Sequence, residues 1–401
     1  MRRTESLNRA QRGSELGAIC GESRFSLTTA AVDEFSVITA TQFREIVSGR
    51  RTGAAAGALR AALRAASVPY GWVVCSRNRR FDRGAAEVHR PSVPVVSVGN
   101  LTVGGAGKTP MVEWISRYLR QRQVRVAILS RGYGAEQGGL NDEALELELA
   151  LPDVPHLQNP DRAASAQIAV DELASQLLLL DDGFQHRRLA RDLDIVLLDA
   201  SEPFGFDHVL PRGTLREPAS GLRRAQVVVL SRADMLDAEE RDRIRRRAFV
   251  LSPQAAWCEA VHEPVAMVDH LGATVALDAA AGQSIAAFCG IGNPAGFRHT
   301  LGTLGCHVAA WREFPDHHAY TRGDVESLSE WARGANAERV VCTRKDLVKL
   351  RVGALGGRPL HALGVELHFT AGERQLWALL EPLIERARQS NSEMFEQAAG
   401  Q

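Results

Sequence analysis

A glycine-rich segment lies between a predicted strand and a predicted helix, and this order of elements restricts the chain to a small set of α/β folds. The strand is Val95–Val98, the helix opens at Pro110, and the segment reads Thr102-Val103-Gly104-Gly105-Ala106-Gly107-Lys108-Thr109. Glycines let backbone N–H groups close around phosphates, and the helix N-terminus adds the positive end of its dipole. Lys108 would then reach the β- and γ-phosphates, and the Thr109 hydroxyl would bind Mg²⁺. The segment predicts a nucleoside triphosphate site, with Thr102 in place of the usual first glycine. The alternative is a strand-to-helix turn without a ligand.

The strands around this segment are predicted to be buried. They are continuous apolar runs, at Val124–Leu129, Leu177–Leu180, Leu193–Leu198 and Val227–Leu230. Continuous runs indicate strands covered on both faces, as in a mostly parallel sheet flanked by helices. Helices are expected at Met111–Arg120 and near Ala163–Leu173. The predicted fold class is a P-loop NTPase-like α/β fold with a second, smaller α/β domain and a basic amphipathic helix near the N-terminus.

The pattern changes after about Trp257, where short extended pieces up to about Ala281 predict a linker. A second α/β unit is expected to follow. Its strands are predicted at Ile285–Cys289, Val308–Trp311 and Arg339–Cys342, its helices near Phe297–Leu304 and Val325–Arg333, and a final amphipathic helix near Glu373–Arg388.

Residues 41–90 carry a local excess of positive charge, because ten arginines stand against Glu45, Asp82 and Glu87. Within this window, Gly53–Ser67 is Ala-rich and helix-prone, and an aromatic-aliphatic stretch and further arginines follow it. A basic helix with an apolar end is typical of an interfacial membrane anchor, in which arginines contact anionic lipid. The alternative is an amphipathic helix that packs on the domain and leaves its basic face in solvent. The residues alone leave both interpretations open.

Composition argues against several other classes. Basic and acidic side chains number 48 each, which disfavours a surface built for nucleic acid. Six cysteines lie far apart without a C-x-x-C pair, as is typical of buried thiols rather than of a zinc site or a disulfide framework. No apolar run reaches the roughly 18 residues of a membrane span and no signal peptide is evident, so a cytoplasmic location is expected. Only three of the 48 basic residues are lysines, Lys108, Lys345 and Lys349, and we expect a chemical reason for them.

Charged side chains also gather where predicted strands end. Asp181 and Asp182 follow an apolar strand, and a carboxylate there can hold Mg²⁺ or its waters at the edge where the phosphate loop lies. Further polar clusters occupy residues 130–134, 182–188, 210–218 and 314–318. Each cluster alone is more typical of a turn or a solvated loop. Together they favour a site for an anionic substrate.

These segments resemble the tetraacyldisaccharide 4′-kinases of lipid A biosynthesis. The resemblance is carried by Ser97–Asn100 with the phosphate loop, Ser130–Gly134, Asp181–Leu189, Leu210–Pro218, Gly290–Pro294, Asp316–His318 and Thr343–Asp346. A substituted first glycine, here Thr102, is usual in that family. One motif departs, since the family's Gly-Asp-Glu-Pro is here Asn141-Asp142-Glu143-Ala144. The acidic pair is kept, but the loop-shaping Gly and Pro are lost.

The resemblance implies ATP-dependent phosphorylation of the 4′-hydroxyl of a tetraacyldisaccharide 1-phosphate at the cytoplasmic face of the inner membrane. ATP and Mg²⁺ are the implied cofactors. The implied partners are the acylated disaccharide phosphate and an anionic lipid surface, without nucleic acid or zinc. The resemblance also implies that the basic helix associates with the membrane, because the acyl chains of the acceptor stay in the bilayer.

The resemblance further implies roles for single residues. The nucleotide is expected at residues 102–109, and the expected catalytic residues are Asp142, His317, Asp316, Lys108 and Asp182. The expected metal ligands are Thr109, Asp181, Asp182 and Glu217. The residues expected to bind the substrate are Arg162, Gln185, His186 and Arg216. Asp142 would be the base or orienter for the sugar hydroxyl, assisted by His317, and Asp316 would orient His317. Since Asp142 and His317 lie in different predicted domains, closure is expected to assemble the pair.

The expected divisions of the chain follow from both lines of reasoning. They are a poorly ordered extension (1–40), a basic membrane-associated helical segment (41–90), a P-loop kinase domain (91–256), linker strands (257–284), a second α/β domain (285–390) and a tail (391–401).

Two other functions fit parts of the sequence. Ser231–Asp234 and Thr343–Asp346 faintly resemble the guanine-reading Asn-Lys-x-Asp loop of a P-loop GTPase-type switch or metallochaperone, but neither has the Asn. The Cys/His clusters expected of a metal-loading protein are also absent from the sequence. A membrane-surface scaffold without catalysis is supported only by the altered neighbours of Asp142.

Overall fold

One 13-stranded sheet runs through the part of the chain that the computed structural model describes, which is residues 40–132, 142–279 and 282–399. Its strands are β1 (Val95–Asn100), β2 (Val126–Ser130), β3 (His156–Gln158), β4 (Leu177–Asp181), β5 (Leu193–Asp199), β6 (Val227–Ser231), β7 (Ala256–Val268), β8 (Thr274–Val275), β9 (Ser284–Cys289), β10 (His307–Glu313), β11 (Arg339–Thr343), β12 (Ala354–Leu355) and β13 (Arg358–Ala371). The α-helices are α1 (Ala40–Ser48), α2 (Ala54–Asp82), α3 (Lys108–Gln121), α4 (Asp142–Ala150), α5 (Arg162–Asp171), α6 (Ala238–Leu251), α7 (Pro294–Thr303), α8 (Arg322–Gly334), α9 (Arg344–Leu350) and α10 (Glu373–Ala399). The path through the sheet is β10-β9-β11-β13-β7-β6-β5-β1-β4-β2-β3.

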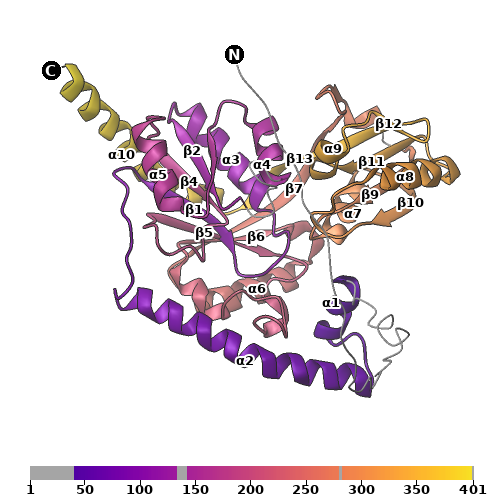
Figure 1. Cartoon of the computed structure of the whole chain (residues 1–401), viewed down its shortest axis with the longest axis horizontal. Coiled ribbons are helices and arrows are strands. Elements are labelled where there is room, and N and C mark those ends of the chain that lie inside the picture. The colour runs from indigo at the N-terminus through magenta and orange to yellow at the C-terminus, as the bar shows by residue number, and fades with distance from the viewer. Residues whose placement is uncertain (1–39, 133–141, 280–281, 400–401) are drawn as a thin grey trace, which may run out of the picture. The chain divides into compact units, whose positions relative to one another are not determined.

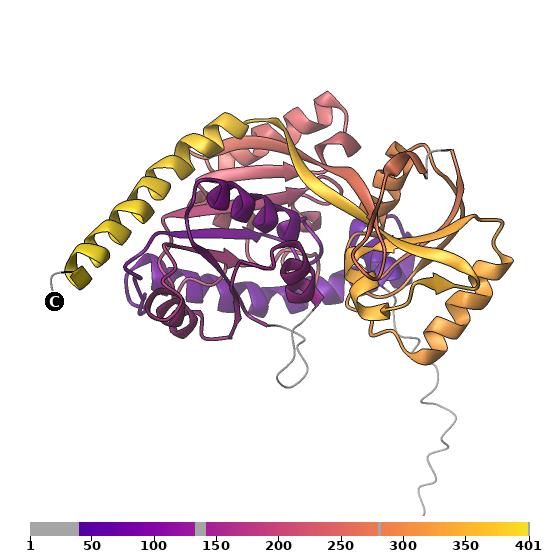
Figure 2. The same cartoon turned by 90° about the horizontal axis from the view of Figure 1, so that it is seen from above.

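The sheet consists of two parallel halves joined by one long antiparallel pair. In the first half, β3, β2, β4, β1, β5, β6 and the start of β7 run parallel. In the second half, β10, β9, β11 and the start of β13 run parallel. Strands β7 and β13 pair antiparallel from Glu259–Ala371 to Val268–Ala362 and so belong to both halves (Figure 2). We call the two halves, with their helices, the first and the second lobe.

Helices cover both faces of the first lobe, as the continuous apolar strands predicted. On one face, alternate residues of β1, β4 and β5 pack against α3, α4 and α10. On the other face, the intervening residues pack against α5 at one side and against α6 and the 3₁₀ helix η2 (Ala219–Arg224) at the other. In the second lobe, α8 and α9 pack on one face and α7 on the other (Figure 1). The predicted α/β fold, a mostly parallel sheet flanked by helices, is confirmed.

The antiparallel pair sets the relative direction of the two lobes. Strand β6 is parallel to β7 and β11 is parallel to β13, while β7 and β13 run in opposite directions. The carboxyl ends of the strands in one lobe therefore point toward the carboxyl ends of the strands in the other. Loops that follow strands carry most binding residues in parallel sheets, so this arrangement places two such sets of loops face to face.

Several predicted elements differ in extent. The segment predicted as a linker of short extended pieces is instead a 13-residue strand, β7, which pairs with β6, β8 and β13. Its partner β13 has 14 residues and was not predicted, nor were α4, α6 and α9. The other predicted strands and helices are present, most with ends shifted by a few residues. The exception is α10, which was predicted to end at Arg388 and continues to Ala399, through most of the predicted tail.

Helix α2 extends well beyond the predicted Ala-rich stretch. It continues through the aromatic-aliphatic residues and most of the arginines that follow, so that Ala54–Asp82 is one helix of 29 residues (Figure 1). Among the described residues, no helix is long and apolar enough to cross a membrane. Three predicted features lie outside the described residues. They are the extension over 1–40 except Ala40, residues Tyr133 and Gly134 of the motif at 130–134, and Asn141.

The close contact of β1 with the loop after β4 gives a test of the packing. A Cβ atom added at Gly99 would lie 2.6 Å from Cβ and 2.8 Å from the backbone N of Phe184, a fully buried residue. Because the neighbours are backbone and core, we expect Gly99→Ala to lower the free energy of unfolding by about 1–3 kcal/mol, measured by urea denaturation. In Gly302→Ala, on α7, the added Cβ meets no atom within 4 Å. This control should unfold at the same or a slightly higher urea concentration. Equal stability of the Gly99 variant and the wild type would contradict the described contact.

Candidate active site

A cavity of about 810 Å³ lies between the facing carboxyl edges of the two lobes. Most of the residues predicted from the sequence line it, namely Val103, Gly104, Gly105, Ala106, Gly107, Lys108, Thr109, Arg162, Asp181, Asp182, Gln185, Arg216, Asp316 and His317. Four predicted residues do not line it: Thr102, Asp142, His186 and Glu217. The second lobe contributes the loop Gly290–Pro294 and the start of α9 in addition.

The phosphate loop follows β1 and ends where α3 begins at Lys108. Gly107, the N-cap residue of α3, has a φ of 84°, in the left-handed region that side chains disfavour. A Cβ atom there would lie 2.7 Å from Nε2 of His262 and 2.8 Å from Oγ of Ser231, so two constraints require glycine at this position. Lys108 Nζ lies 3.4 Å from Oδ1 of Asn100 and 3.6 Å from Oδ1 of Asp182.

Neighbouring segments fix the backbone of the loop on both sides. The Val103 N–H donates to the carbonyl oxygen of Thr214 at 2.8 Å, and Thr102 forms an isolated bridge with Leu215. On the other side, Arg232 donates to the carbonyl oxygen of Gly105 at 3.1 Å. These contacts hold the loop backbone from both sides. Within the loop, the Ala106 N–H donates to the Gly104 carbonyl oxygen at 3.1 Å.

The strand-end aspartates have different surroundings. The carboxylate of Asp181 is buried, and its Oδ1 has no hydrogen-bond partner among the described residues. Burial raises the pKa of Asp181, and the nearby Glu143 carboxylate raises it further. A buried carboxylate oxygen without a donor fits a cation as its partner.

Asp182 is instead surrounded by positive charge. Both of its carboxylate oxygens accept from Nη1 of Arg216, at 2.8 and 2.7 Å. Burial raises the pKa of Asp182, but the charges of Lys108 and Arg216 outweigh it, so the net shift is strongly downward. Arg162, which is buried at the start of α5, donates to the Asp182 carbonyl oxygen at 3.0 Å.

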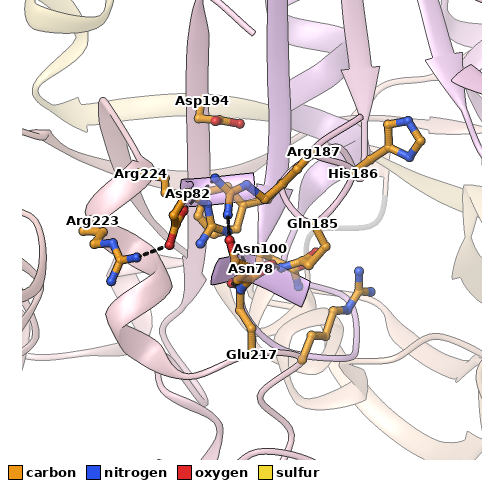
Figure 3. Close-up of polar contacts among 12 residues, drawn as sticks. Asn78, Asp82, Asn100, Gln185, His186, Arg187, Asp194, Glu217, Arg223 and Arg224 are labelled. Atoms are coloured by element: carbon orange, nitrogen blue, oxygen red, sulfur yellow. Dashed lines mark hydrogen bonds and ion pairs between the residues drawn. The ribbon is translucent and has the colours of Figure 1, made fainter. Parts of the chain in front are cut away.

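Glu217 is enclosed by protein donors, and the geometry gives no support to its predicted place among the metal ligands. Its Oε1 accepts from Gln185 at 3.1 Å and from Arg224 at 2.7 Å, and its Oε2 accepts from Asn78 of α2 at 2.7 Å (Figure 3). The side chain is fully buried. Glu217 thus joins α2 to the loop after β4, and the Gln185 amide continues the link to the Asn100 carbonyl oxygen at 2.9 Å.

His186 points away from this cluster, although it neighbours Gln185 in sequence (Figure 3). Its Nε2 is buried without a partner among the described residues, and burial lowers its pKa to about 4. The structure therefore does not bring His186 to the cavity with the other residues predicted to bind substrate.

Across the cavity, Asp142 and His317 are in contact despite their separation of 175 residues. Nδ1 of His317 donates to Oδ2 of Asp142 at 3.2 Å. His317 has a φ of 60°, in the left-handed region that only a few per cent of residues other than glycine adopt and that occurs often at functional sites. Because His317 lines the cavity and Asp142 does not, the imidazole is the member of the pair that faces a ligand.

The surroundings of this pair keep Asp142 ionised. Burial raises the pKa of Asp142, but hydrogen bonds from His317 and Lys349 outweigh it and lower the pKa to about 2. The Lys349 ammonium lies 2.6 Å from Oδ2 of Asp142. Asp316, predicted to orient His317, is 3.9 Å from Nε2 of His317 and lies closer to Lys345, at 3.2 Å.

Sequence reasoning missed a buried network that joins the lobes beneath the phosphate loop. Asp199, at the end of β5, pairs with Arg232 and accepts from the Asn293 amide at 3.1 and 2.9 Å. Asn293 lies in the second lobe and also caps α7 by accepting from the Gly296 N–H. The family-like segment Gly290–Pro294 was the signal for Asn293. The segment Ser231–Asp234, which contains Arg232, was noted only as a faint guanine-reading motif, and nothing in the local sequence marks Asp199.

The two segments that resemble guanine-reading loops have other structural uses. Arg232 belongs to the network just described, and Asp234 pairs with His299 at 2.6 Å. Asp346 is fully buried and accepts from Thr343, Tyr320 and the Gly290 N–H. Since its carboxylate is occupied, Asp346 cannot read a guanine.

The glycine-rich loop lies between β1, a central strand of a parallel sheet, and helix α3. An aspartate pair lies beside it, at the end of the neighbouring strand β4. This arrangement defines a P-loop nucleoside-triphosphate-binding protein. The model of the LpxK family, described as tetraacyldisaccharide-1-P 4′-kinase, matches residues 59–385. The chain belongs to this family and is a kinase of lipid A biosynthesis. The resemblance inferred from the sequence is thereby confirmed.

Individual relatives agree with this assignment. The tetraacyldisaccharide 4′-kinase of Anaeromyxobacter sp. (strain K) is 42% identical over 356 residues, which cover 84% of this chain and 93% of the relative. That of Geobacter sulfurreducens is 35% identical over 343 residues and covers 81% of this chain and 94% of the relative. The crystal structure of LpxK from Aquifex aeolicus in complex with ATP matches with a TM-score of 0.64 and 30% identity, over 81% of this chain and 99% of that one.

The contacts of Gly107 give a test of the site. We expect Gly107→Ala to lower the affinity for a magnesium-nucleotide complex by at least about tenfold, because the φ of 84° and the contacts with His262 and Ser231 force the loop to move. Isothermal titration calorimetry measures the effect, and Gly302→Ala, where the added methyl meets nothing, should bind as the wild type does. Unchanged nucleotide affinity in the Gly107 variant would show that the loop does not bind the phosphates.

Proposed function

We propose that this chain transfers the γ-phosphoryl group of ATP to the 4′-hydroxyl group of a tetraacyldisaccharide 1-phosphate. The observation that carries the proposal is that the phosphate loop of one lobe and His317 of the other line the same cavity. Family membership supports the acceptor, and the ATP in the Aquifex aeolicus structure supports the donor.

In the proposed reaction, the phosphate loop binds the β- and γ-phosphates through its N–H groups, and Lys108 adds a charge to them. Lys108 is already poised between Asn100 and Asp182 at the entrance of α3. Arg162 and Arg216, which surround Asp182, present further positive charge to the phosphates or to the anionic acceptor. Their contacts with Asp182 fix both guanidinium groups before the substrates arrive.

The residues near the loop also fit a magnesium ion. The Thr109 hydroxyl and the buried Asp181 carboxylate would hold it, and a bound Mg²⁺ neutralises charge on the phosphates. Two protein ligands are sufficient, because Mg²⁺ usually keeps several waters and takes the remaining ligands from the phosphates.

The proton of the sugar hydroxyl passes to the Asp142–His317 pair. The hydroxyl oxygen forms a bond to the γ-phosphorus, the bond from this phosphorus to the bridging oxygen of ADP breaks, and Nε2 of His317 takes the proton. Asp142, with its pKa lowered to about 2, stays ionised and stabilises the imidazolium that forms. This assigns Asp142 the orienting role that the sequence left open between base and orienter.

We also propose that α2 brings the acceptor from the cytoplasmic face of the inner membrane. Its outer face exposes Val68 (69%) and Trp72 (71%) beside exposed arginines, which suits an anionic lipid surface. The same helix reaches the cavity with Tyr70, Val73, Val74 and Arg77. An acceptor whose acyl chains stay in lipid could therefore reach the phosphate loop along α2.

The kinase assignment is tested with labelled ATP, Mg²⁺ and tetraacyldisaccharide 1-phosphate in detergent. We expect product from the wild type, and a loss of at least about 100-fold in kcat/KM for Lys108→Ala, since a phosphate-binding charge is removed. Asp142→Asn should lower kcat by about 100-fold while nucleotide affinity changes little, because it acts on proton transfer. Arg322→Ala, on an exposed face of α8, is the control. Product formation by the Lys108 variant at the wild-type rate would reject the site.

The membrane role of α2 is tested by sedimentation with vesicles that contain phosphatidylglycerol. Replacing both Val68 and Trp72 by Ser should weaken binding at least tenfold, because burial of each large apolar side chain contributes about 1.5–3 kcal/mol. Leu271→Ser, at an exposed side chain on the turn between β7 and β8, is a matched control that should bind normally. Wild-type binding by the α2 variant would contradict this role.

A further inference from the structure

The lysines of this chain converge on one site. Only three of the 48 basic residues are lysine, and all three have side chains that are 10–12% exposed. Lys108 belongs to the phosphate loop, whereas Lys345 and Lys349 lie one turn apart on α9 of the second lobe. A compact ammonium group differs from the guanidinium group that this chain uses elsewhere, because it is a point charge with three rotatable donors.

The two lysines of α9 make different contacts. Lys349 is turned toward Asp142, at 2.6 Å, and donates to the carbonyl oxygen of His318 at 3.2 Å. Lys345 lines the cavity, where it lies 3.2 Å from Oδ1 of Asp316 and 3.4 Å from Nε2 of His317. Lys349 therefore serves the Asp142 carboxylate, and Lys345 faces the ligand space.

The contact with His317 fixes where Lys345 must lie during the reaction. The ionised Asp142 can only accept, so Nδ1 of His317 carries the hydrogen and Nε2 offers its lone pair to the Lys345 ammonium. A proton acceptor lies about 3 Å from the attacking oxygen, which lies about 3 Å from the phosphorus it attacks. A cation in contact with Nε2 is thus within reach of the oxygens of the phosphoryl group in transfer.

We propose that Lys345 is a catalytic residue that binds the terminal phosphoryl group of ATP from the second lobe, opposite Lys108 of the first. This proposal rests on the proposed kinase function. Lys345 keeps its charge throughout, and no bond to it forms or breaks. Two of its three donors contact Asp316 and His317, and among the described residues no group accepts from the third, which can bind a phosphoryl oxygen. When the acceptor hydroxyl takes its place at Nε2, the donor now on His317 is released to the phosphoryl group as well.

The electrostatic setting suits this role. The charge on a phosphoryl group in transfer is spread over its outer oxygens, and a positive charge in a site with little solvent stabilises it strongly. Although burial alone would lower the pKa of Lys345, Asp316 and Glu143 raise it above its usual value, so that the group is cationic. Because Lys345 belongs to the second lobe, the terminal phosphate would be bound from both lobes at once.

The test compares the affinities of two nucleotides that differ in the terminal phosphate, Mg-ADP and Mg-AMP-PNP, by calorimetry on the full chain. For Lys345→Met we expect at least a tenfold loss of affinity for AMP-PNP, less than a twofold change for ADP, and about a 100-fold loss in kcat. Lys345→Arg, which keeps the charge, should recover much of the AMP-PNP affinity and guards against misfolding of the methionine variant. Arg322→Met removes an exposed charge from the same lobe and should change none of these values.

Three results would overturn the proposal. If kcat falls while the ratio of AMP-PNP to ADP affinity is unchanged, Lys345 acts by positioning His317. If only the KM for the disaccharide rises, Lys345 binds the acceptor. If nothing changes, it has no role in the reaction. The ratio of AMP-PNP to ADP affinity is measured without the acceptor, so it decides the role of Lys345 whether or not the disaccharide is phosphorylated. Failure of the wild type to phosphorylate the disaccharide would instead reject the proposed function.

Discussion

The site depends on the antiparallel pairing of β7 and β13. Each strand begins in one parallel half of the sheet and ends in the other, so the pair reverses the direction of the second lobe relative to the first. As a result, the loop after β1 and the loops after β9, β10 and β11 all open into one cavity. Without this pair the chain would have two separate sheet edges, each with half of the polar groups that phosphoryl transfer requires. The register of this pair shifts between Gly364 and Val365 and between Phe369 and Ala371, and such irregularities bend a strand and increase its twist.

One buried set of polar contacts between the lobes lies next to the phosphate loop. The Asp199–Arg232 pair and the Asn293 amide are buried together, and Arg232 also donates to the loop backbone at Gly105. A buried ion pair is costly to break, because removing one partner leaves a charge without compensation. These contacts hold the second lobe against the loop that binds the nucleotide. Contacts farther out, between Asp142, His317 and the lysines of α9, involve partly exposed side chains and can rearrange around a substrate.

The sequence was sufficient to predict the elements that are determined by neighbouring residues in the chain. The phosphate loop, the buried strands β1, β4, β5 and β6, and the aspartates at the end of β4 could be predicted from glycine spacing and apolar runs. Strand β7 was misjudged because its exposure alternates and it contains Pro264, both typical of a segment outside a parallel sheet. Glu217 was predicted as a metal ligand from the family resemblance alone. Its local sequence gives no sign that Asn78, Gln185 and Arg224 surround its carboxylate. The rarity of lysine was visible in the sequence, but only the fold shows that Lys345 and Lys349 meet Asp142 and His317.

The central claim is that both lobes act on the same terminal phosphate. A crystal structure of the chain with Mg-AMP-PNP tests it most directly. The account predicts the triphosphate in the loop Gly104–Lys108, with the γ-phosphate between the Lys108 ammonium and the imidazole of His317. A nucleotide bound outside this loop, or a γ-phosphate directed away from the second lobe, would contradict it.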